Sequence, residues 1–123
     1  MSRCLDDLEP ELRTVIFQFL ARCVEAGIPL CIVDTLRTDD EHVANLKKGT
    51  SRIARSKHLS DELGYAHAID VAPYEVYQLH GADKLQWNPD APAWLKIGII
   101  GAGLGVKWGG RWTMKDMGHF EAG

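Results

Sequence analysis

The chain has 123 residues, of which 46% are apolar and 25% are charged, as is usual for a folded globular protein. This length favours one domain, spanning 1–123, with one functional site and no separate binding module. The formal net charge is −3, and the basic residues are scattered among acids, so the composition argues against nucleic acid as a partner.

The N-terminal sequence MSRCLDDLEPELR has acids among its first ten residues and lacks the apolar core of a signal peptide. We therefore expect the chain to be made and kept in the cytoplasm. Its apolar runs are much shorter than the roughly 20 residues that cross a bilayer, so no membrane association is expected. Cys4, Cys23 and Cys31 have no metal-binding spacing and are predicted to be free thiols.

In the first half of the chain, apolar residues at helical spacing predict a helix over 10–26, opened by Pro10 and closed by Gly27. The β-rich run over 30–33 predicts a buried strand that carries Arg37 at its far end. A short polar helix is predicted over 39–48, followed by a basic loop through Arg52 and Arg55.

In the second half, the segment AHAIDVAPY predicts a strand that ends at Pro73 and places Asp70 in an interior position. A mostly buried helix is predicted over 92–101, ended by the glycines that follow. The segments VKWGGRW and GHFE predict two short strands around a Gly-Gly turn. Helices interleaved with antiparallel strands indicate an α+β fold.

Four residues carry the chemistry that this sequence offers. His58 and His119 supply two imidazoles, while Asp70 and Asp116 supply one carboxylate ligand and one further acid. A catalytic zinc ion takes three protein ligands and keeps a fourth position for water, whose proton a nearby acid can accept. The set therefore predicts a hydrolase with one zinc ion per chain.

The strings SKH, AHAID, WGGRW and DMGHFE, in this order, resemble the zinc peptidases of the hedgehog/D-Ala-D-Ala-peptidase fold, and most of all phage L-alanyl-D-glutamate endopeptidases. The matching residues run from Arg37 to Glu121. The resemblance implies a small antiparallel sheet flanked by helices. It also implies that His58, Asp70 and His119 bind zinc.

By the same resemblance, Asp116 is the general base, and Arg37 is both a catalytic residue and a substrate-binding residue. Related carboxypeptidases usually have Glu at the position of Asp116, so the shorter acid favours the endopeptidase branch. Ser56 is a candidate for binding substrate, although serine is equally common in loops. Glu121 shares the strand parity of His119 and is expected to face the site.

The sequence departs from the family pattern between the first histidine and the aspartate. Eleven residues separate His58 from Asp70, where the family usually has about six, and Ala66 replaces a glycine. An extra loop accommodates this length at small entropic cost. The spacing also raises His67 as a rival ligand, but residues three apart on a strand point to opposite faces, so His58 is preferred.

Several residues have structural alternatives. Asp70 can be a buried or capping carboxylate, His119 a core histidine, and Asp116 a helix cap or a solvated acid. Arg37 can pair with Asp39 or Asp40. Trp108 and Trp112 are expected to lie in the core, or alternatively to form the wall of a peptide groove. His42 and His80 are expected to lie on the surface.

The resemblance implies that the substrate is the peptide stem of peptidoglycan and that the enzyme is a phage or prophage endolysin. In that role a monomeric enzyme, lacking a cell-wall-binding domain, waits in the cytoplasm until a holin opens the membrane. Two alternatives stay open: a D-Ala-D-Ala carboxypeptidase or dipeptidase on the same fold, and a non-catalytic zinc domain that binds peptides.

Overall fold

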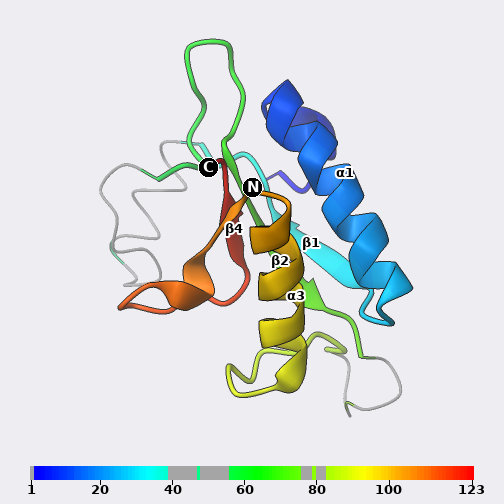
Figure 1. The fold of residues 1–123 in the computed structure, drawn as a ribbon. Coiled ribbons are helices and arrows are strands. Elements are labelled where there is room, and N and C mark those ends of the chain that lie inside the picture. The colour runs from blue at the N-terminus through cyan, green and yellow to red at the C-terminus, as the bar shows by residue number, and fades with distance from the viewer. Residues whose placement is uncertain (1, 39–46, 48–55, 76–78, 80–82) are drawn as a thin grey trace.

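The protein is described by a computed structural model over residues 2–38, 47, 56–75, 79 and 83–123 (Figure 1). Its principal helices are α1 (Pro10–Glu25) and α3 (Pro92–Gly103), with short 3-10 helices η1 (Leu5–Asp7) and η2 (Gly109–Arg111). The strands are β1 (Leu30–Asp34), β2 (Ala68–Pro73), β3 (Lys107–Trp108) and β4 (His119–Glu121). They form one antiparallel sheet in the order β1-β2-β4-β3. The predicted α+β fold, a small antiparallel sheet with flanking helices, is confirmed.

Helix α1 forms where the apolar spacing predicted it and packs against the sheet. The Glu9 side chain accepts hydrogen bonds from the backbone N–H groups of Glu11 and Leu12, which caps the first turn beside Pro10. The helix ends before Gly27, whose φ of 81° is readily adopted only by glycine. Its buried face joins the core through Leu12, Ile16, Phe19 and Cys23.

The two faces of β2 have different roles. Ile69 and Val71 are fully buried in the core that includes α1 and α3 residues. Because side chains alternate along a strand, Asp70 between them points to the opposite face. The sheet thus separates the apolar core from the face that carries the candidate site.

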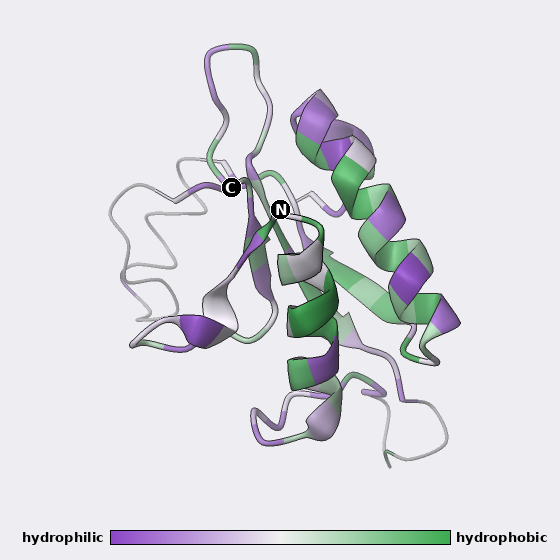
Figure 2. Cartoon of the chain, in the orientation of Figure 1, coloured by the Kyte–Doolittle hydropathy of each residue, from purple (hydrophilic) through white to green (hydrophobic). Residues whose placement is uncertain are grey.

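Two predictions about burial and length need correction. Strand β1 is half-buried rather than buried, because it lies at the edge of the sheet and pairs only with β2. Helix α3 continues past its predicted end to Gly103. Gly101 lies inside the helix and allows close packing, because a Cβ there would lie 2.7 Å from the Phe120 ring. Its solvent side is exposed at Leu95 and Ile99, and Figure 2 shows apolar colour around most of its middle turns.

The Gly-Gly segment is not the tight turn of a hairpin. Gly109 and Gly110 begin the 3-10 helix η2, and a longer loop follows before β4. Strand β3 still pairs with β4, through Lys107 with Glu121 and Trp108 with Phe120. The glycines are needed here for close packing, since a Cβ at Gly110 would overlap the Trp108 ring.

Some predictions fall outside the described residues, namely the 39–48 helix apart from residue 47, the Arg52 and Arg55 loop, His42 and His80. All three cysteines are free thiols, as predicted. Burial raises the pKa of the Cys23 thiol to about 11. Among the described residues, none of the helices has the length and apolar character needed to span a bilayer.

Candidate metal centre

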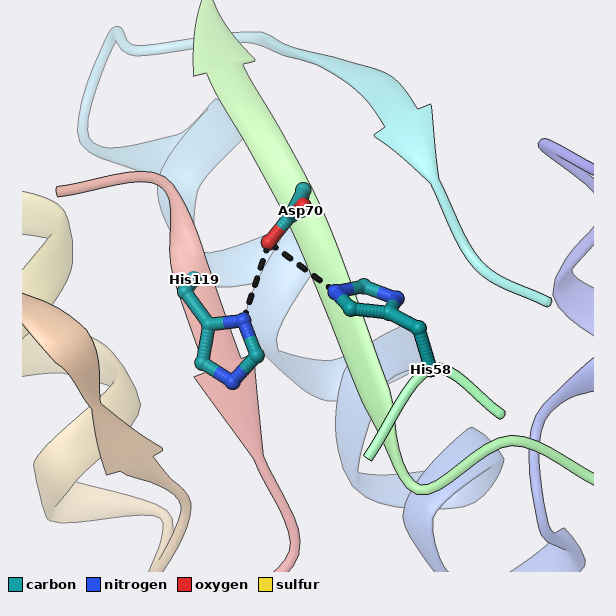
Figure 3. A group of neighbouring side chains, drawn as sticks. All are labelled: His58, Asp70 and His119. Carbon is teal, nitrogen blue, oxygen red and sulfur yellow. Dashed lines mark hydrogen bonds and ion pairs between the residues drawn. The ribbon is translucent and has the colours of Figure 1, made fainter. Parts of the chain in front are cut away.

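Three side chains from distant parts of the sequence meet on the polar face of the sheet (Figure 3). Asp70 lies on β2, His119 on the neighbouring strand β4, and His58 on the loop before β2. Asp70 and His119 are directly paired across the two strands. Nitrogen and oxygen atoms of the three residues lie within 4.8 Å of one another.

The orientation of His58 is set by the segment that follows β1. Its Nδ1 lies 2.7 Å from the backbone carbonyl oxygen of Thr35, which can only accept a hydrogen bond, so Nδ1 carries the proton. In the neutral ring, Nε2 therefore presents a lone pair, 3.2 Å from Asp70 Oδ1. This buried Nε2 has no hydrogen-bond partner among the described residues. A lone pair facing a carboxylate oxygen calls for a cation between them.

His119 is held from its other side. Its Nδ1 lies 3.1 Å from Asp70 Oδ1, and its Nε2 lies 2.9 Å from Glu121 Oε1. When Nε2–H donates to Glu121, the Nδ1 lone pair faces the same point as His58 Nε2. A carboxylate behind a histidine is the usual outer partner of a metal-binding imidazole.

The charges of these groups depend on one another. Burial alone raises the pKa of the Asp70 carboxyl, but the hydrogen bond with His119 and the neighbouring His58 imidazole outweigh it and hold the pKa far below its ordinary value. For His119, burial lowers the pKa, but the hydrogen bond with Asp70 and nearby carboxylates raise it overall. Asp70 is therefore a carboxylate, and without a metal ion His119 tends to keep a proton.

Two nitrogen donors and one carboxylate oxygen are a donor set that suits zinc. The unsatisfied Nε2 of His58 and the ionised Asp70 both fit a divalent cation at this point. The three sequence-predicted ligands are thus brought together by the fold, and their role as zinc ligands stays a prediction.

Asp116 lies at the edge of this group. Its Oδ2 is 4.0 Å from His119 Nδ1, and its side chain is 55% exposed. Partial burial and the negative charge of Asp70 both raise its pKa. A carboxylate at the rim, open to solvent and with increased proton affinity, is suited to accept a proton from a water molecule.

The loop that carries Asp116 is held close to the sheet. The backbone N–H of Val71 donates to the Gly118 carbonyl oxygen at 2.9 Å, and Trp108 Nε1 donates to the Met117 carbonyl oxygen at 2.7 Å. A Cβ at Gly118 would lie 2.4 Å from the Val71 carbonyl oxygen. Glycine therefore allows the approach that places Asp116 beside His119.

Comparison with known proteins agrees with this arrangement. A family model described as D-alanyl-D-alanine carboxypeptidase matches residues 49–122, more than half of the chain. The chain belongs to this peptidase family. The fold is similar to a crystal structure of the Serratia marcescens L-Ala D-Glu endopeptidase ChiX, with a TM-score of 0.73 and 25% sequence identity. The match covers 97% of this chain and 83% of that one. No curated protein matches the chain.

As a member of the peptidase family, the chain is a hydrolase, as predicted. Arg37 follows strand β1 and lies beside Asp70. Its Nη2 is 3.9 Å from Asp70 Oδ2. The same nitrogen is 2.7 Å from Asp34 Oδ2, so the arginine pairs mainly with Asp34. Asp39 and Asp40, considered from the sequence, lie outside the described residues.

Ser56 and His67 each make a contact outside the group of three side chains. The Ser56 Oγ accepts a hydrogen bond from the backbone N–H of His58 at 3.1 Å, so its hydroxyl orders the loop before His58. His67 turns away from Asp70 and contacts Asp61 at 2.8 Å. Asp61 also accepts from the N–H groups of Leu63 and Tyr65, which organises the additional loop seen in green in Figure 1.

The two tryptophans have different surroundings in this peptidase. Trp108 is a core residue that stacks on Phe120, with ring centroids 6.5 Å apart. Trp112 is half-buried, and its ring centroid is 4.9 Å from that of His119.

Two groups that contact the site residues were not predicted from the sequence: the Asp34 side chain, which pairs with Arg37, and the Thr35 carbonyl, which contacts His58. The only signal for Asp34 was an acid at the end of an apolar strand.

Proposed function

We propose that this peptidase is a zinc enzyme that cleaves the L-alanyl-D-glutamate bond in the peptide stem of peptidoglycan. The observation that carries the proposal is the similarity to the L-Ala D-Glu endopeptidase ChiX along 97% of the chain. The site adds support, because His58, Asp70 and His119 offer a zinc donor set with Asp116 at its rim. Zinc dependence also fits the peptidase family.

In this proposal zinc is held by His58 Nε2, Asp70 Oδ1 and His119 Nδ1. When bound, it supplies Lewis-acid polarisation of the scissile carbonyl and lowers the pKa of a water molecule. Asp116 accepts the proton of the attacking water on its carboxylate and later returns it to the leaving amine. Its exposed position allows both transfers.

Arg37 contributes a fixed positive charge next to the reacting group. The Arg37 side chain is 10% exposed, and its planar guanidinium can donate to a carbonyl oxygen or a carboxylate. It is therefore placed to stabilise the negative charge that develops on the carbonyl oxygen, or to bind a carboxylate of the stem peptide. Ser56 stays a candidate for substrate binding through its hydroxyl proton.

The test is digestion of purified peptidoglycan by the zinc-loaded protein, followed by mass spectrometry of the fragments. The proposal expects new glutamate amino termini and new alanine carboxyl termini. A His119→Ala variant, which removes one predicted ligand, serves as the inactive control. Loss of zinc-dependent cleavage on chelation, with recovery on adding zinc, tests the metal.

A second candidate is a D-alanyl-D-alanine carboxypeptidase, because the matching family model carries that description. Release of terminal D-alanine without new glutamate amino termini selects it. Zinc binding without any cleavage selects the non-catalytic peptide-binding alternative.

We further propose that the biological role is host-cell lysis as a phage or prophage endolysin, which rests on the endopeptidase activity. Expression with a holin should lyse the cells, whereas expression without the holin should leave them intact. A holin-expressing culture with the His119→Ala variant controls for lysis by the holin itself.

A further inference from the structure

Two aspartates face each other across the first two strands. Asp34 at the end of β1 is the pairing partner of Asp70 on β2, after an irregularity in register between Ile32 and Asp34. Like charges directly opposite on paired strands repel each other. A cation must therefore compensate this pair.

Arg37 supplies that cation, and its two contacts are unequal. Its Nε and Nη2 lie 3.2 and 2.7 Å from Asp34 Oδ2, whereas Nη2 is 3.9 Å from Asp70 Oδ2. Asp34 is 2% exposed and Arg37 10% exposed. A buried carboxylate requires a charged partner, so the pair with Asp34 determines where the guanidinium lies.

The arginine is also fixed by its main chain. Its backbone N–H donates to the carbonyl oxygen of His58 at 2.9 Å. The carbonyl oxygen of Thr35, between Asp34 and Arg37 in the sequence, accepts from His58 Nδ1. The segment after β1 therefore positions both Arg37 and the predicted ligand His58. With its backbone fixed, Arg37 can change its contacts only by rotation of its side chain.

We propose that Asp34 is a positioning residue that anchors Arg37 and prevents its guanidinium from taking Asp70 as main partner. Among the residues that the structure describes, the other carboxylate beside Arg37 is Asp70, at 3.9 Å. An arginine paired with Asp70 competes with a metal ion for the same carboxylate. Asp34 thus keeps Asp70 available for zinc and holds the arginine in its place beside the substrate. This inference rests on the proposed function for the zinc ion at Asp70 and for the arginine's role toward substrate.

The experiment measures Zn²⁺ affinity by competition with a chelating dye, for four proteins: the wild type, Asp34→Asn, Arg37→Ala and the double variant. We expect Asp34→Asn to weaken zinc binding about tenfold, within the range found for outer partners of metal ligands. Arg37→Ala should bind zinc as tightly as the wild type or more tightly, because it removes the competitor. The double variant should match Arg37→Ala, because Asp34 acts through the arginine.

Asp61→Asn is the matched control. It makes the same chemical change in another aspartate that contacts a basic side chain, His67, at 2.8 Å, and it should leave zinc affinity unchanged. Thermal unfolding establishes that each variant is folded. Asp34→Ser provides a second neutral replacement if the asparagine variant does not fold.

Equal weakening by Asp34→Asn with and without Arg37 would overturn the inference, since the effect would not pass through the arginine. Unchanged zinc affinity in Asp34→Asn would overturn it as well. Peptidoglycan cleavage by the wild type is a separate readout. Its absence refutes the proposed function, while the zinc affinities still decide the role of Asp34.

Discussion

Glu121 Oε1 lies 2.9 Å from Nε2 of His119, two residues earlier on the same strand. Residues two apart on a strand share a face, so this contact is built into β4. It leaves His119 Nδ1 to face Asp70, and it fixes the ring in that orientation.

Glu121→Gln should therefore weaken zinc binding roughly tenfold, because a neutral amide orients the ring less firmly and lowers the basicity of Nδ1. Chelator competition measures the affinity. Glu62→Gln, in an exposed part of the additional loop, is the control and should bind zinc like the wild type. An affinity unchanged in Glu121→Gln contradicts an outer-partner role for Glu121.

Zinc affinity should rise with pH through the range in which His119 loses its proton. The pKa of His119 is raised above its ordinary value of 6.5, through its hydrogen bond with Asp70 and nearby carboxylates, even though burial opposes this. The proton therefore competes with zinc at and somewhat above that pH, and binding releases it. Titration calorimetry in buffers of different ionisation enthalpy counts the released protons. His67→Asn should show the same pH dependence as the wild type, because His67 lies at Asp61.

Asp116→Asn should lower kcat by on the order of 100-fold or more, because a general base contributes 10²–10⁴. Zinc affinity should stay close to that of the wild type, since Asp116 Oδ2 is 4.0 Å from the nearest imidazole nitrogen. Steady-state cleavage of stem peptide and zinc titration together separate the two effects. Asp90→Asn, in an exposed turn before α3, should retain full activity. Cleavage at the wild-type rate by Asp116→Asn removes this residue from the mechanism.

Gly118→Ala should destabilise the fold by about 2 kcal/mol, because its Cβ would overlap the Val71 carbonyl oxygen, and backbone cannot move aside cheaply. Activity should fall with it, since the same approach places Asp116 beside His119. Gly103→Ala is the control, because nothing lies within 4 Å of its Cβ position. Urea unfolding gives both free energies, and equal values for the two variants contradict the close-approach argument.

The elements that local patterns determine were predictable. The apolar spacing of α1 and the alternation in β2 located these elements within a residue or two, because each pattern buries one face of a local structure. The order of the motifs brought His58, Asp70 and His119 into one hypothesis. Strand parity also placed His67 on the other side of β2 from Asp70, and the structure shows it contacting Asp61.

Other features depend on contacts between segments far apart in the chain. The half-burial of β1 follows from its place at the sheet edge, which no local pattern contains. The requirement for glycine at position 101 of α3 follows from the close packing of Phe120 against it. The sequence by itself determined which side chains were available for chemistry. Only the tertiary structure decided which ring nitrogens face Asp70 and that Asp34 holds Arg37, because pairing of β1, β2 and β4 sets those distances.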